Sequence, residues 1–203
     1  MSILLERIEK LLEQIYMSDQ FLQKEIEQVA KSKNEIQSVL FLKDNHVIGN
    51  KRHDIATGSY KSVQFNIEDV LAKAIELDAN TVIGIHNHPN QTVHPSRADI
   101  ETFKHMKDIF SKHNIRSRAY VTTFDGFKTR FTEYDEATRP ELHQMDYLIK
   151  AQNSLKELNI QFDQKDLEQK LSKVENITDF EREFNKVLEK YNMHFVPRGA
   201  AIN

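Results

Sequence analysis

Cysteine is absent from this sequence of 203 residues, and its absence limits the available chemistry. Without thiols the chain can form neither disulfides nor thiolate zinc fingers, so any metal ion must be held by histidine, aspartate or glutamate. The lack of cysteine also fits a reducing compartment, and we expect a cytoplasmic protein.

Long hydrophobic runs and an excess of positive charge are missing as well. No segment approaches the roughly 18 consecutive apolar residues that a membrane span requires, and charges follow Met1 too soon for a secretory signal. The formal net charge of -3 gives no general attraction to nucleic acid. We therefore expect a soluble protein without a membrane partner, and nucleic acid is not the partner that we favour.

The chain is long enough for one sizeable domain with helical additions, and 39% hydrophobic residues suffice for its core. We divide it into an N-terminal helical segment over residues 1–31, a central α/β domain over 32–136 and a C-terminal helical extension over 137–203. Helical patterns cover residues 3–29, with a break near 18–19, and residues 66–78, 96–113 and 140 onward. Strand patterns cover residues 35–42, 47–49, 81–86, 115–123 and 127–134. The strands and the helices between them lie in the central segment, which supports this division.

Some of these elements carry finer expectations. The helix over 66–78 should turn Val70, Leu71, Ala74, Ile75 and Leu77 inward, and residues 178–181 resemble a capping signal. The apolar face of the first helix either packs on the sheet of its own domain, which we favour, or forms a dimer contact. Terminal helices could in this way support a homo-oligomer.

The most informative stretch runs from Thr81 to Asp99. A buried strand should end near His86 and His88, and because residues two apart point to the same side of a strand, both imidazoles can face one point while Asn87 points away. Pro89 ends the strand, and Asp99 falls in the first turn of the next helix. Two imidazoles and one carboxylate are the protein ligands of a catalytic zinc.

Simpler interpretations exist for the same residues. Ser96 and Asp99 alone could be the reciprocal pair of a helix capping box. His94 and His53 suit no ligand position and are interpreted as surface or rim residues. The combination of residue types across a strand, a loop and a helix start nevertheless favours the metal site.

The pattern His86-Asn87-His88-Pro89 with Pro95-Ser96 and Asp99 resembles the JAMM (MPN+, JAB) metallopeptidases, most closely their RadC-type bacterial branch. The likeness covers residues 35–134, and one departure is Asn90-Gln91, where that branch has Ser-Gly. Residues 56–59, followed by Val63 and Phe65, resemble the turn and strand that precede the first long helix in that branch. The resemblance implies a JAB/MPN-like (cytidine-deaminase-like) fold, in which helices sandwich a mixed β-sheet. It also implies one Zn²⁺ per chain, bound by His86, His88 and Asp99.

The same resemblance places a catalytic glutamate at the start of an earlier strand, which is Glu35 here. Glu25, Glu27 and Glu68 are weaker alternatives. Glu35 would act as the base on a zinc-activated water, and Ser96 would donate a hydrogen bond to the oxyanion.

Three functions then compete. The leading one is a zinc-dependent peptidase or isopeptidase that acts on a protein or peptide, with ubiquitin-like conjugates as one class of substrate. The others are a RadC-like accessory protein of DNA repair or mobile elements and a non-catalytic MPN scaffold. The complete ligand set argues against the scaffold, although fold alone does not settle function.

Overall fold

The computed structural model describes residues 19–59, 62–89, 92–134 and 140–196. The predicted helical pattern over 3–18 and the Asn90-Gln91 pair lie outside these ranges. Within them, no helix is both long enough and apolar enough to cross a membrane.

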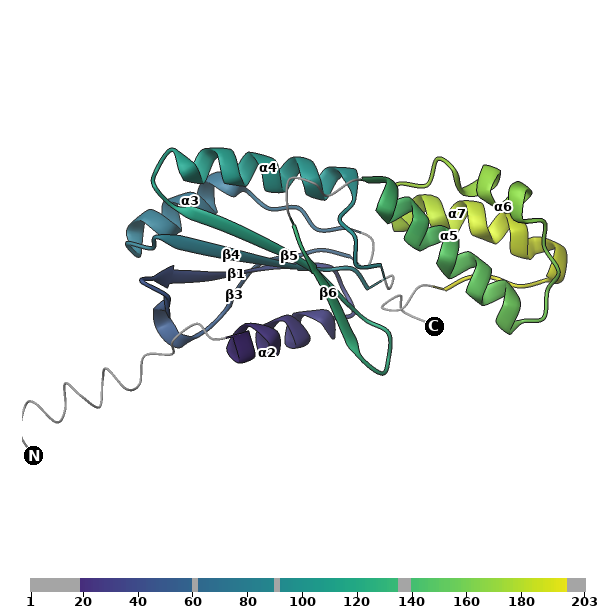
Figure 1. Cartoon of the computed structure of the whole chain (residues 1–203), viewed down its shortest axis with the longest axis horizontal. Coiled ribbons are helices and arrows are strands. Elements are labelled where there is room, and N and C mark those ends of the chain that lie inside the picture. The colour runs from purple at the N-terminus through teal and green to yellow at the C-terminus, as the bar shows by residue number, and fades with distance from the viewer. Residues whose placement is uncertain (1–18, 60–61, 90–91, 135–139, 197–203) are drawn as a thin grey trace, which may run out of the picture.

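The centre of the molecule is a mixed β-sheet, as the sequence predicts (Figure 1). Its strands follow the order β2-β1-β4-β5-β6, and β3 also pairs with β1. The pairing of β4 with β5 is parallel, and the other pairings are antiparallel. The strands are β1 (Ile36–Lys43), β2 (His46–Val47), β3 (His53–Thr57), β4 (Thr81–Asn87), β5 (Arg116–Phe124) and β6 (Thr129–Glu133).

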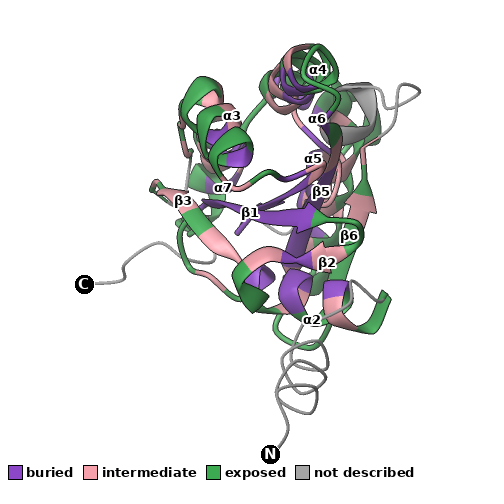
Figure 2. Cartoon of the chain, turned by 90° about the vertical axis from the view of Figure 1, so that its left-hand side faces the viewer, coloured by how far each residue is buried: buried purple, intermediate pink, exposed green. Residues whose placement is uncertain are grey.

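Helices cover both faces of this sheet. The helix α2 (Asp19–Ala30) lies on one face, and α3 (Ile67–Glu76) and α4 (Arg97–Ser111) lie on the other (Figures 1 and 2). Strands covered on both sides are mostly apolar, and β1 is buried along nearly its whole length. The α/β fold class with a helix-covered mixed sheet is therefore confirmed.

The two sides of the sheet have separate cores because successive side chains of a strand point to opposite faces. Leu40, Leu42, Ile83 and Ile85 pack with α2, which contributes Leu22, Ile26 and Val29. Val39, Phe41 and Val82 pack with α3 and α4. The apolar face of α2 thus lies on the sheet of its own domain, which is the alternative that the sequence favours.

The C-terminal residues form a helical unit with a core of its own. It consists of α5 (Pro140–Glu157), α6 (Gln164–Leu171) and α7 (Ile177–Leu188), and it lies beside the start of α4 (Figure 1). Its centre is aromatic: the ring of Phe180 stacks on the rings of Tyr147 and Phe184, with centroid distances of 5.0 Å and 5.1 Å. Its buried apolar residues form one cluster separate from those of the sheet. We call this the C-terminal unit, and we call residues 19–134 the sheet domain.

Some local expectations are wrong. The predicted strand over 47–49 ends at Val47, because Ile48–Asn50 form a 3-10 turn in which Gly49 has a φ of 72°. The predicted turn over 56–59 begins later, since β3 continues to Thr57, and Val63 and Phe65 are not in a strand. Ile75 is 52% exposed, since it lies about 100° around the helix from the buried Ala74. The cap of α7 is Asn176 rather than a residue of 178–181: its side chain accepts a hydrogen bond from the Asp179 amide, and asparagine is among the strongest capping residues.

Candidate metal centre

The end of β4 carries both histidines into the interior. His86 is within the strand and His88 follows it, and both are buried. Asn87 points away from them, as predicted, but into a buried environment. Its side-chain oxygen accepts a hydrogen bond from the Ile36 amide at 2.7 Å, and its nitrogen donates to the carbonyl of Asn34 at 3.0 Å. Asn87 thereby holds the start of β1 beside the histidines.

Glu35 comes directly before β1 and is only 7% exposed. Its backbone amide donates to the Ser59 carbonyl at 2.8 Å, and its carbonyl accepts from the Gly58 amide at 2.9 Å. These bonds continue the pairing of β3 with β1 and direct the carboxylate inward. Its Oε2 lies 3.9 Å from His86 Nε2.

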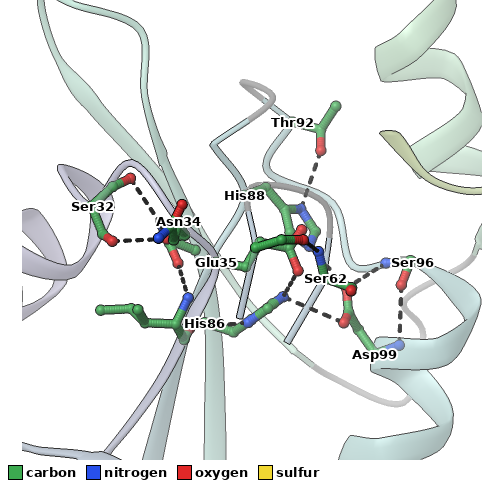
Figure 3. Close-up of polar contacts among 12 residues, drawn as sticks. Ser32, Asn34, Glu35, Ser62, His86, His88, Thr92, Ser96 and Asp99 are labelled. Carbon is green, nitrogen blue, oxygen red and sulfur yellow. Dashed lines mark hydrogen bonds and ion pairs between the residues drawn. The ribbon is translucent and has the colours of Figure 1, made fainter. Parts of the chain in front are cut away.

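Asp99 reaches the same point from the first turn of α4. It forms a capping box with Ser96: the Asp99 amide donates to Ser96 Oγ at 3.1 Å, and the Ser96 amide donates to Asp99 Oδ2 at 2.8 Å. Asp99 Oδ1 lies 3.6 Å from His86 Nε2, and Oδ2 lies 3.0 Å from His88 Nε2. The capping role and the site role therefore coexist in one side chain (Figure 3).

This arrangement fits a divalent metal ion. Potential ligand atoms of Glu35, His86 and His88 all lie within 4.8 Å of one another, so this group contains Glu35 rather than Asp99, the third ligand that the sequence predicts. His86 Nδ1 is 3.2 Å from the Ile36 carbonyl, which can only accept, so the ring proton lies there and Nε2 keeps its lone pair. His88 Nδ1 is 3.1 Å from Thr92 Oγ1, and its Nε2 also faces the carboxylates. Imidazole and carboxylate donors without thiolates suit zinc.

Burial and charge set the protonation of these groups. Burial lowers the pKa of His86 to about 4, which keeps the ring neutral, and burial raises the pKa of Glu35 to about 7. Burial would also raise the pKa of Asp99, but the attraction of His86 and the hydrogen bond from His88 outweigh it and hold that pKa well below its usual range. One carboxyl is thus near its titration point at neutral pH, and the other is firmly ionised.

The other candidates lie elsewhere. Glu25 pairs with Arg52 at 2.7 Å, Glu27 accepts from Gln23 at 3.3 Å, and Glu68 is exposed at the start of α3. His53 packs edge-on against Phe41 with ring centroids 5.4 Å apart. His94 lies on the loop near the site, 2.6 Å from Asp146 of α5.

A cavity of about 430 Å³ opens over these residues. Its walls come from both parts of the molecule, and the residues from the C-terminal unit are Tyr147, Asn176, Ile177, Thr178 and Asp179. The sequence did not reveal this wall. Tyr147 occupies an ordinary apolar position of an amphipathic helix, and no local pattern links it to histidines so far back in the chain.

Comparison with known proteins identifies the sheet domain. A family model described as a RadC-like JAB domain matches residues 15–121, which is more than half of the chain. The chain belongs to this family. Within the RadC-like JAB segment lie Glu35, His86, His88, Ser96 and Asp99, whereas the whole C-terminal unit lies outside it.

Curated relatives carry the name "UPF0758 protein", which states no activity. The protein from Vibrio cholerae serotype O1 is 31% identical over 93 residues, which are 46% of this chain and 58% of the relative. The one from Acidithiobacillus ferrooxidans is 27% identical over 92 residues, or 45% of this chain and 41% of the relative. The chain thus spans about half the length of the curated relatives it matches.

Proposed function

We propose that this RadC-like JAB protein is a zinc-dependent hydrolase of amide bonds in proteins or peptides, including isopeptide bonds. One observation carries the proposal: Nε2 atoms of two buried histidines converge with carboxylates of Glu35 and Asp99 on the wall of one cavity. Zinc held by such donors lowers the pKa of a bound water to about 7 and polarises a substrate carbonyl.

The two carboxylates differ in a way that suggests their roles. Asp99 contacts both imidazoles, is the more strongly ionised and is fixed by the Ser96 amide, as a third ligand should be. Glu35 reaches the same cavity from the start of β1 with a pKa of about 7, which suits a group that takes a proton and returns it. Glu35 would therefore accept the proton of the attacking water and deliver it to the leaving amine.

Ser96 would act on the substrate carbonyl. Its Oγ accepts a hydrogen bond from the Asp99 amide, so the hydroxyl proton can point elsewhere, and the residue lines the cavity. A hydroxyl held in this way can donate to an oxyanion as negative charge develops there.

The test separates ligand from base by measuring zinc content and hydrolysis independently. Metal analysis of the purified full chain should find about one zinc, following the three-ligand pattern. Asp99→Ala should lose most of this zinc. Glu35→Gln should keep it, while cleavage of a quenched fluorescent peptide library and of an isopeptide-linked lysine peptide should fall by about 100- to 10,000-fold.

Each other result has a defined meaning. If Glu35→Gln loses zinc and Asp99→Ala keeps it, then Glu35 is the metal ligand and Asp99 is the base. If the wild type binds one zinc but cleaves none of the probes, the non-catalytic scaffold is favoured.

A further inference from the structure

Two adjacent residues of α5 connect the C-terminal unit to the loop that joins the metal ligands. Asp146 Oδ2 accepts hydrogen bonds from the backbone amides of Val93 at 3.3 Å and His94 at 3.4 Å. The same oxygen lies 2.6 Å from His94 Nδ1. A single carboxylate oxygen thus fixes the backbone between His88 and Asp99.

Tyr147 makes the second connection. Its side chain is fully buried and stacked on Phe180, and its hydroxyl hydrogen-bonds the Thr92 side chain. Thr92 Oγ1 in turn lies 3.1 Å from His88 Nδ1. An unbroken series of contacts therefore runs from the core of the C-terminal unit to one imidazole of the metal centre.

The two histidines consequently differ in what orients them. His86 Nδ1 donates to the Ile36 carbonyl of β1, which is part of the sheet. His88 depends on Thr92, a loop residue held from outside the sheet domain by Tyr147. The partner of the ring nitrogen away from the metal fixes both the tautomer and the angle of a ligating histidine, so this difference affects the metal directly.

We propose that Asp146 and Tyr147 are positioning residues of the metal centre, which hold residues 92–94 so that His88 presents Nε2 to the metal. The inference rests on the proposed zinc-dependent function. It makes the C-terminal unit, which lies outside the family match, a determinant of metal affinity.

The first test is the zinc affinity of the full chain, measured by competition with a chromophoric chelator. Outer partners of metal ligands typically contribute about 10- to 100-fold in affinity. Tyr147→Phe, which keeps the stacked ring, should weaken binding by about 10-fold, and Asp146→Ala should approach the upper end of that range. Asp146→Asn keeps an oxygen acceptor, so its zinc affinity should lie between those of Asp146→Ala and the wild type. Tyr191→Phe, at an exposed tyrosine of the same unit, should match the wild type.

The second test uses the metal-free protein. Long-range ¹H–¹⁵N spectra of the imidazoles report which ring nitrogen carries the proton. Tyr147→Phe should change the His88 signals and leave those of His86 unchanged. Equal changes at both histidines would indicate a general loosening and overturn the proposal, as would unchanged zinc affinity in Tyr147→Phe and Asp146→Ala. If the wild type binds no zinc, the proposed function fails, whereas the selective response of His88 still decides the positioning role.

Discussion

The sheet domain and the C-terminal unit meet at one cavity, but they contribute to it differently. The sheet domain supplies every donor atom of the candidate metal centre, from strand ends and the start of α4. The C-terminal unit supplies a wall and the contacts that hold the intervening loop, from a separately packed aromatic core. Under the proposed function, the family-matched part would carry the reaction, and the part outside the family match would shape metal affinity and access.

The largest effect is expected from a test of whether the C-terminal unit unfolds separately from the sheet domain. Phe180 is fully buried among Tyr147, Phe184 and Phe195, and Phe180→Ala should cost about 3–5 kcal/mol of stability in the C-terminal unit. Hydrogen exchange should show lost protection in α5–α7 and retained protection in β1, β4 and β5. Phe41→Ala, in the core of the sheet domain, is the matched change and should give the reverse pattern. Equal loss in both parts after either substitution would mean that they unfold as one unit.

Ser96 allows a test within the sheet domain that separates chemistry from helix capping. Ser96→Ala should slow turnover by about 100- to 1,000-fold if its hydroxyl stabilises the oxyanion. It should also lower the free energy of unfolding by about 0.5–2 kcal/mol through loss of the cap of α4. Asn66→Ala removes the cap of α3 and is the control, since it should lower stability without changing turnover. If the two variants behave alike in both assays, Ser96 is only a cap.

The part of the site that the sequence predicts is the part that is local. His86, His88 and Asp99 lie close together along the chain, so strand periodicity and a helix start were enough to bring them together. Glu35 was found only by resemblance, because its inward direction depends on backbone pairing with Gly58 and Ser59 that no local pattern reveals.

The contacts that could not be predicted are long-range. Thr92 is a loop residue of ordinary composition, and Tyr147 reads as one more apolar position of a helix. Their meeting depends on how α5 packs against the loop, which is decided by the aromatic core of the C-terminal unit. The division of the chain at residue 136 stays a prediction, and the shared cavity shows that the site itself crosses it.

The pH dependence of stability offers a smaller effect, which comes from Glu35 of the sheet domain. Burial raises the pKa of Glu35 from 4.5 to about 7, so the folded metal-free protein binds this proton more tightly than the unfolded chain does. Its contribution is fully present below pH 4.5 and is lost as the pH rises through about 7. The stability of the wild type relative to Glu35→Gln should therefore fall by on the order of 3 kcal/mol across this window, as measured by urea unfolding with a chelator present. Parallel profiles would contradict the burial of an ionisable carboxyl there.

The smallest effect is expected at an exposed contact between the sheet domain and the C-terminal unit, in comparison with the contacts of Asp146 and Tyr147. Arg97 and Glu175 form an ion pair at 3.7 Å across the junction, and both side chains are about half exposed. Water and salt screen such a pair, so Arg97→Ala should change the free energy of unfolding by only about 0–1 kcal/mol. Zinc affinity should not change either, because the pair holds neither Thr92 nor His94. If Arg97→Ala instead weakened zinc binding as much as Tyr147→Phe, docking of the C-terminal unit as a whole, rather than the specific contacts of Asp146 and Tyr147, would control the metal centre.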